Sequence, residues 1–147
     1  MHSTALITDL YELTMAQSYL ENGKTGRAVF SLFVRELPQN RNFLVACGLE
    51  TLIEYLERFR FGDEELRYLK SLGIFKDSFL DFLREYEFDG DLYAIPEGKI
   101  VFQKEPLIQV EGSLPKVQIL ETLIINVIHF QTLIASKAVR SYLVAKG

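Results

Sequence analysis

Near the N-terminus, the stretch TDLYELT places two carboxylates and a tyrosine ring where a helix is expected to begin. The Asp9 carboxylate can accept hydrogen bonds from the free N–H groups of a first helical turn. Glu12, three residues on, stands where the second acid of a capping box would reach back. A helix start has no such use for Tyr11. The residues alone offer it one role, packing as the first member of an i, i+4 series with Met15 and Tyr19.

Arg35 stands at the end of an apolar segment, AVFSLFVR, that is expected to form a strand over 28–35, apolar on both sides and covered. Open α/β sheets present ligand contacts at strand ends, and a guanidinium there can hold a phosphate through two hydrogen bonds. The alternative is a surface ion pair with Glu36 or another acid. Arg41, in the following loop, is a weaker candidate for the same kind of contact.

The sequence does not contain the other common catalytic and metal-binding patterns. Its two histidines, His2 and His129, have no ligand-like neighbours, so neither a metal site nor a Ser-His-Asp or Cys-His arrangement is supported. No glycine-rich nucleotide loop is present. Cys47 is expected to be a buried, unreactive thiol, and His129 a core or interface histidine. We therefore predict no catalytic residue and no metal ligand in this chain.

The composition is that of a globular protein. The 147 residues are 48% hydrophobic with a net charge of −4, which argues against a general nucleic-acid surface. A single cysteine favours a reducing, cytoplasmic location. The N-terminus lacks the basic and apolar regions of a signal peptide. The longest uncharged stretch, 122–136, is shorter than the ~20 residues of a membrane span, so no membrane partner is expected and the stretch predicts a buried helix.

Hydrophobic periodicity predicts one α+β domain. Asn22-Gly23 should end the first helix, and Asp63 and Asp77 should cap two later ones. Helices are expected at 9–22, 48–58, 63–72, 76–86 and 117–145, strands at 28–35 and 42–46, and a small cluster of antiparallel strands within 91–112. The last helix is apolar around most of its middle. This pattern indicates burial on several sides, by a longer chain or an obligate oligomer.

Seven segments together resemble one family, nicotinate phosphoribosyltransferase. They occur in the family's order over nearly the whole chain: ITDLYELTMAQSYL, AVFSLFVRELPQNRNFLVACGLE, YLERFRF, YLKSLGIF, FLDFLREYEFDGDLYAIPEG, VFQKEPLIQVEG and QILETLIINVIHFQTLIASKAVR. The resemblance implies a type II phosphoribosyltransferase that joins nicotinate to the ribose of phosphoribosyl pyrophosphate. The products would be nicotinate mononucleotide and pyrophosphate, in NAD synthesis, with ATP hydrolysis coupled through a phosphohistidine.

The same resemblance implies a fold and an assembly. Family members combine an N-terminal α/β domain with an irregular α/β barrel, in a head-to-tail homodimer whose active site lies at the interface. Residues 1–147 resemble the N-terminal domain only, and the barrel is absent from this chain. The phosphorylated histidine is expected downstream, so His129 does not inherit that role. Mg²⁺ and ATP are implied as cofactors, with their sites mostly outside these residues, and we expect this chain alone to be inactive.

Three residues match substrate-binding positions of the resembling family. Tyr11 matches a tyrosine that stacks on the pyridine ring in the partner subunit's active site. Asp9 would lie near the ribose or its metal-bound pyrophosphate, although helix capping alone also explains this residue. Arg35 matches an arginine that approaches the phosphoribosyl phosphates from across the dimer.

Two alternatives stay open at this point. One is a relative specific for nicotinamide, since the residues that distinguish the two rings are expected beyond Gly147; the segment FVRELPQNRNFLVACGLE favours the nicotinate branch by resemblance. The other is a non-catalytic module that keeps the dimerising surface and pairs with a partner chain. Its support is the end of the sequence at Gly147 and the strongly apolar final helix.

Overall fold

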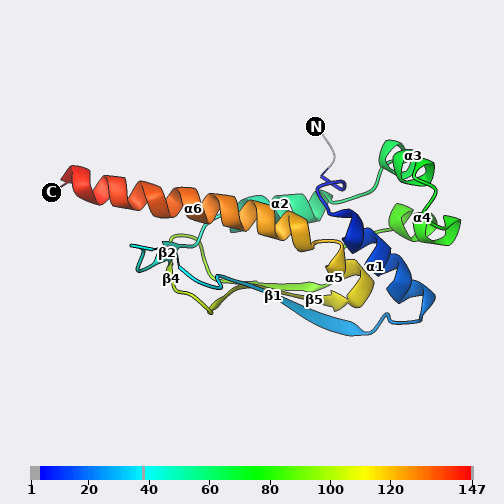
Figure 1. The fold of residues 1–147 in the computed structure, drawn as a ribbon, viewed down its shortest axis with the longest axis horizontal. Helices are drawn as coiled ribbons and strands as arrows, with labels where there is room; N and C mark the ends of the chain where they lie inside the picture. The colour runs from blue at the N-terminus through cyan, green and yellow to red at the C-terminus, as the bar shows by residue number, and fades with distance from the viewer. Residues whose placement is uncertain (1–3, 38, 147) are drawn as a thin grey trace.

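The computed structural model describes residues 4–37 and 39–146, and one long helix runs along most of their length (Figure 1). The elements in chain order are α1 (Leu10–Glu21), β1 (Arg27–Phe33), β2 (Leu44–Val45), α2 (Leu49–Arg58), α3 (Asp63–Ser71), α4 (Asp77–Arg84), β3 (Asp91–Ala94), β4 (Ile100–Val101), β5 (Pro106–Ser113), α5 (Leu114–Gln118) and α6 (Glu121–Lys146). The predicted α+β class is confirmed, and the described residues do not close a barrel.

Two antiparallel sheets carry the β structure. The larger has the strand order β1-β5-β3, with Phe30 and Leu92 both opposite Val110, and the smaller pairs β2 with β4. The expectation that β1 is covered on both sides is wrong, because exposed and partly buried residues alternate along it, and Val29 and Phe33 are among the exposed ones. The helices cover only one face of this sheet.

The outer face of the larger sheet is held by charge. Arg27 on β1 pairs with Glu111 on β5 at 2.5 Å and with Asp91 on β3 at 2.7 Å. One guanidinium therefore bridges all three strands. Because these groups are largely solvent-exposed, the pairs help the strand register more than the stability.

The start and end of α1 follow the local sequence. Leu13 and Ala16 are buried on one side of the helix. Gly23 ends it in the left-handed region, at φ 65°, where glycine has no steric penalty. The N–H of Lys24 donates to the carbonyl of Tyr19 at 2.7 Å, which satisfies a free carbonyl of the last turn. The predicted stop at Asn22-Gly23 is confirmed.

Helices α3 and α4 form a small unit around stacked aromatic rings. The capping prediction for Asp63 and Asp77 is wrong: the N-cap residues are Gly62 and Lys76, without side-chain caps. The two aspartates are the first helical residues and instead pair with Arg84 at 3.0 Å and Lys70 at 2.9 Å, which joins the two helices. Five aromatic rings pack next to these helices. Phe79 and Phe82 are stacked, and the other contacts are edge-to-face, among Phe59, Phe61, Phe82 and Tyr86.

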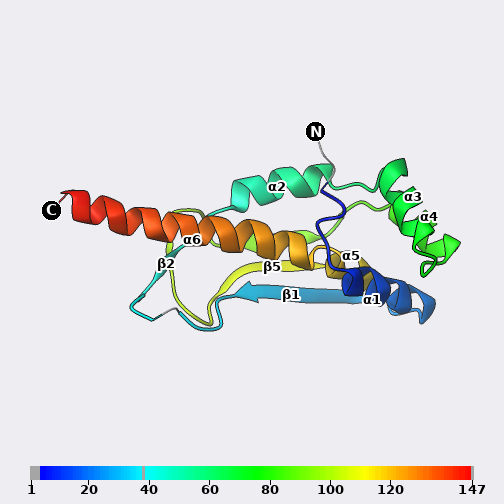
Figure 2. The same cartoon turned by 45° about the horizontal axis from the view of Figure 1, so that its top comes forward.

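The predicted helix over 117–145 is two helices in the structure. Helix α5 is short and precedes a turn at Ile119 and Leu120, after which α6 runs for 26 residues. Helix α6 lies between α2 on one side and the larger sheet on the other, and its C-terminal part projects beyond the other elements (Figure 2). The first half of α6 therefore supplies a wall to the core.

Only one stripe of α6 is buried within the described residues. The buried residues are Leu123, Ile124, Val127, Ile128, Thr132 and Ser136, whereas Phe130 is 67% exposed. Complete burial of this helix is therefore not observed. By length and composition alone, α6 is long and apolar enough to cross a membrane: its most apolar 18 residues have a mean hydropathy of 1.3, and 28% of them are buried. Core helices of soluble proteins meet the same criterion, so this is weak evidence for a membrane span.

The close approach of β3 to β5 gives a stability test. A Cβ at Gly90 would clash with the carbonyl oxygen of Glu111 and lie 2.8 Å from the Phe88 ring, whereas a Cβ at Gly26 meets nothing within 4 Å. We expect Gly90→Ala to lower the free energy of unfolding by about 1–3 kcal/mol. Gly26→Ala, the control, should stay within about 0.5 kcal/mol of the parent. Urea unfolding measures both, and equal stabilities would contradict this close approach at the sheet edge.

Candidate functional site

The first turn of α1 lies against the first turn of α6. Asp9 is the N-cap residue of α1, with extended backbone angles, but its side chain makes no capping bond to its own helix. Its Oδ2 instead accepts a hydrogen bond from the Thr122 hydroxyl at 2.8 Å. The expected side-chain cap is therefore wrong at Asp9, because the start of α6 offers a competing donor.

Glu12 is fully buried, at 0% exposure, and reaches α6 rather than the start of its own helix. It accepts the backbone N–H of Thr122 at 2.9 Å, and Thr8 donates to its other oxygen. The Thr122 hydroxyl also lies 2.5 Å from Glu12, so its single proton is shared between Glu12 and Asp9. The predicted capping box is wrong, because this carboxylate caps a different helix. Burial raises the pKa of the Glu12 carboxyl, against hydrogen bonds from Thr122 and Thr8 that favour its charged form.

Tyr11 points away from this buried contact. Its side chain is 46% exposed, so packing into the core with Met15 and Tyr19 does not account for it; Met15 is itself exposed. Partial burial, followed by interaction with the carboxylate of Glu121 and the nearby acids Glu12 and Asp9, raises the pKa of Tyr11 to about 12. The ring is therefore a neutral phenol across the physiological range, with its hydroxyl directed to a carboxylate and part of its surface open.

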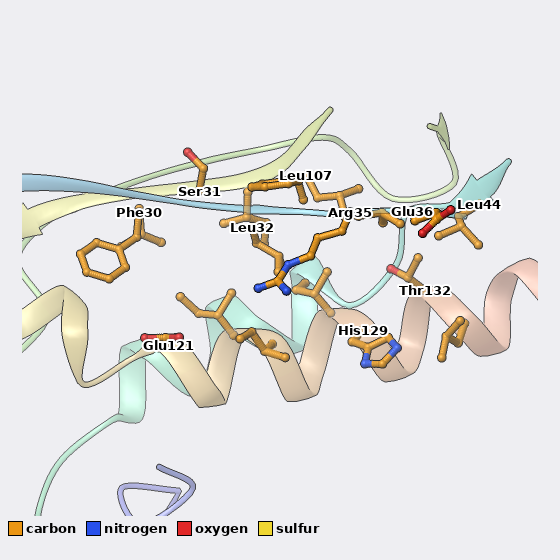
Figure 3. Close-up of a pocket in the computed structure, with 18 of the residues that line it drawn as sticks. Phe30, Ser31, Leu32, Arg35, Glu36, Leu44, Leu107, Glu121, His129 and Thr132 are labelled. Atoms are coloured by element: carbon orange, nitrogen blue, oxygen red, sulfur yellow. The ribbon is translucent and has the colours of Figure 1, made fainter. Parts of the chain in front are cut away.

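Arg35 opens into a cavity of about 510 Å³ between the larger sheet and α6. The strand ends at Phe33, and Arg35 follows two residues later. Figure 3 shows its side chain extending towards α6, with Glu121 towards one end of the cavity and His129 towards the other. Most of the other lining residues are apolar: Phe30, Leu32, Phe33, Val34, Leu44, Leu107, Ile108, Val110, Val117, Ile124, Ile125, Ile128 and Leu133.

Arg35 has no hydrogen bond or ion pair to any residue in 4–37 or 39–146. The alternative prediction, a surface ion pair with Glu36, is therefore not observed, although Glu36 also lines the cavity. A guanidinium without an internal anion beside an apolar surface is suited to bind an external one. Arg41 does not line the cavity and is not brought to the candidate site.

Glu121 connects the two parts of the candidate site. It interacts with Tyr11, lines the Arg35 cavity, and receives a hydrogen bond from the Gln118 amide at 2.8 Å. Sequence reasoning did not single it out, because a tertiary contact rather than a local motif brings α6 to α1. Tyr11 and the Arg35 cavity are thus neighbours of one carboxylate.

The remaining sequence candidates take other places. Cys47 is partly buried, and burial raises the pKa of its thiol, as expected for an unreactive cysteine. His129 is exposed on α6 and lines the cavity, so of the two predicted places, core or interface, the core is wrong and the interface stays a prediction. His2 lies outside the described residues. Within the described ranges, no group of three or more His, Cys, Asp or Glu side chains could hold a metal ion.

The contact between Tyr11 and Glu121 is testable by alkaline titration. Subtracting the ultraviolet titration of Tyr11→Phe from that of the parent chain isolates the Tyr11 phenol. We expect its midpoint near pH 12 rather than the ordinary 10.0, so between these values the folded state holds a proton that the unfolded state has released, and stability falls as the pH rises. Glu121→Gln should move the midpoint part of the way back towards 10.0, because it removes one of the charges that raise the pKa of Tyr11. A midpoint at the ordinary value in the parent would contradict this geometry.

Comparison with known proteins matches this chain to one family. The family profile described as the nicotinate phosphoribosyltransferase (NAPRTase) N-terminal domain matches residues 6–129. The chain is 46% identical over 146 residues to the nicotinate phosphoribosyltransferase pncB2 of Mycobacterium tuberculosis, covering 99% of this chain and 32% of that protein. It is 43% identical over 139 residues to the nicotinate phosphoribosyltransferase of Bacillus subtilis, covering 94% of this chain and 28% of that protein.

A solved structure gives the same result for the fold. The crystal structure of human nicotinic acid phosphoribosyltransferase matches with a TM-score of 0.88 and 35% identity, over 97% of this chain and 29% of that one. The chain therefore spans about a third of the length of these relatives. With most of its residues inside the family profile, this chain belongs to the nicotinate phosphoribosyltransferase family, in which it corresponds to the N-terminal domain.

Proposed function

We propose that these residues are the N-terminal part of an enzyme that joins nicotinate to the ribose of phosphoribosyl pyrophosphate. Nicotinate mononucleotide and pyrophosphate would be formed in NAD synthesis, with ATP hydrolysis coupled. Family membership supports this proposal, since the similar proteins from M. tuberculosis and B. subtilis are named nicotinate phosphoribosyltransferases. This chain would supply substrate contacts rather than a catalytic group.

The observation that carries the proposal is the placement of Glu121. Glu121 interacts with the exposed Tyr11 and lines the cavity that contains Arg35, which has no ion partner within the described residues. A planar ring acceptor and a phosphorylated sugar are the two partners of the proposed reaction. One surface of this chain thus offers a contact suited to each.

Tyr11 would orient the pyridine ring. Face-to-face or offset contact with a flat aromatic ligand is worth about 1 kcal/mol beyond burial. The carboxylate of Glu121 holds the phenol hydroxyl, which leaves the ring as the part available to a ligand. Holding nicotinate in line for attack by its ring nitrogen lowers the entropic part of the activation barrier in the complete enzyme.

Arg35 would hold phosphate oxygens of the sugar substrate. Breaking the bond between ribose and pyrophosphate leaves an oxocarbenium-like sugar and a highly charged leaving group, and fixed cations stabilise such charge. The apolar lining around Arg35 lowers the local dielectric and strengthens that interaction. Asp9, at the N-terminus of α1 and hydrogen-bonded by the Thr122 hydroxyl, would lie near the ribose.

A homodimer with the active site at the interface would place these contacts in the partner subunit's site. Support comes from four exposed apolar residues close to Tyr11 in the sequence, namely Leu6, Ile7, Leu10 and Met15. Exposed apolar surface is typical of interaction sites when it is contiguous. We extend the same proposal to the exposed face of α6, which would be covered by protein rather than by lipid.

The described residues contain no group of three or more His, Cys, Asp or Glu side chains that could hold a metal ion by themselves. Asp9 and Glu12, the nearest carboxylates, already accept hydrogen bonds from Thr122. We propose that residues outside this chain hold Mg²⁺ and ATP. A cytoplasmic location is part of the proposal.

The isolated chain should not catalyse the reaction, since the barrel of the resembling family is absent from it. We expect no nicotinate mononucleotide when the purified 147-residue chain is incubated with nicotinate, phosphoribosyl pyrophosphate, Mg²⁺ and ATP. A full-length relative, assayed in parallel, serves as the positive control. Sustained product formation by the short chain would overturn the assignment of catalysis to other residues.

The ring contact is tested in a full-length enzyme that carries this domain. Tyr11→Ala should raise the KM for nicotinate about fivefold, the equivalent of losing about 1 kcal/mol, while kcat changes less. Tyr68→Ala is the matched control, because Tyr68 is 55% exposed on α3 and away from the candidate site. An unchanged nicotinate KM in Tyr11→Ala would count against stacking. A KM raised for nicotinamide but not for nicotinate would favour the nicotinamide-specific alternative.

A further inference from the structure

Glu12 is the most deeply buried charged group of the described residues, and the proposed reaction gives it no direct role. It is one of four polar or charged residues buried there, with Gln118, Thr132 and Ser136, and it is 0% exposed. Burying a carboxylate without hydrogen-bond partners costs free energy, so the partners of Glu12 indicate its structural role. All of them come from Thr8 and Thr122.

These bonds fix the angle between two helices. The N–H of Thr122 is a free donor of the first turn of α6, and a carboxylate at a helix N-terminus is favoured by the helix dipole. Glu12 belongs to the first turn of α1, so the two helix starts are held side by side (Figures 1 and 2). The Thr122 hydroxyl lies within hydrogen-bond distance of Asp9 as well, at 2.8 Å, so one residue of α6 anchors both carboxylates of α1.

The same contact decides where Tyr11 points. Adjacent residues on a helix project about 100° apart. With Glu12 directed into α6, Tyr11 is turned towards the surface beside Glu121, which agrees with exposures of 0% for Glu12 and 46% for Tyr11. A rotation of α1 would move the ring away from Glu121 without altering the ring itself.

We propose that Glu12 is a positioning residue for substrate binding, which acts by capping α6 from α1 and so fixing the orientation of Tyr11. This inference rests on the proposed function, because it requires Tyr11 to contact the substrate ring. Glu12 itself does not touch the substrate. Its role extends to Asp9 through their common partner Thr122.

A double-mutant cycle in the full-length enzyme tests it. We expect Glu12→Ala to raise the nicotinate KM roughly three- to tenfold with a smaller change in kcat, as Tyr11→Ala does. In the Tyr11→Ala background, Glu12→Ala should add less than about twofold, because the ring it positions is already gone. Glu12→Gln, whose oxygen can still accept the Thr122 N–H, should retain most of the affinity. If the alanine variant does not fold, Thr122→Val, which removes the hydroxyl on the other side of the contact, takes its place in the cycle.

Glu97 supplies the matched control. Its carboxylate also caps a helix from outside, accepting the N–H of Gly48 at 2.6 Å and of Glu50 at 3.3 Å at the start of α2. Glu97→Ala should therefore lower stability without raising the nicotinate KM. Additive effects of the Glu12 and Tyr11 variants, or equal KM effects at Glu12 and Glu97, would overturn the positioning role. An unchanged KM in Tyr11→Ala would instead overturn the proposed function and this inference together.

Discussion

The hydrogen bonds from Thr122 to Glu12 are the contact on which the candidate site depends. They join the starts of two helices, α1 and α6, that belong to opposite ends of the described chain. A carboxylate inside the core is stable only with such donors, so this position strongly restricts the orientation of α1. Tyr11, Asp9 and Glu121 take their places from this one restriction.

Helix α6 contacts two separate parts of the fold. It packs against α2 on one side and forms one side of the cavity under the larger sheet on the other (Figure 2). The N-termini of α6 and α2 are each capped by a carboxylate from elsewhere in the chain. Glu12 accepts a hydrogen bond from the start of α6, and Glu97 accepts one from the start of α2. Capping by distant residues ties the start of each helix to tertiary packing.

The chemistry of the cavity follows from its walls. A guanidinium in a mostly apolar lining is suited to an anion, and Arg35 has no ion partner among the described residues. The half-exposed Tyr11 ring interacts with Glu121, which also lines the cavity. One carboxylate therefore links the two contacts.

The sequence by itself determined the elements and the family. Local signals such as the Asn22-Gly23 stop and the helical spacing of Leu123, Ile124 and Val127 depend only on neighbouring residues. Apart from the predicted 117–145 helix, which is divided in two, the helices and strands lie close to their predicted bounds. Only the tertiary structure decided which partner each carboxylate takes. Asp9 and Glu12 fit a capping box in their own helix, yet both bind Thr122, because the start of α6 brings free donors within their reach. The placement of Glu121 beside Tyr11, with Arg35 in the adjoining cavity, follows from that long-range choice and has no signature in the order of the residues.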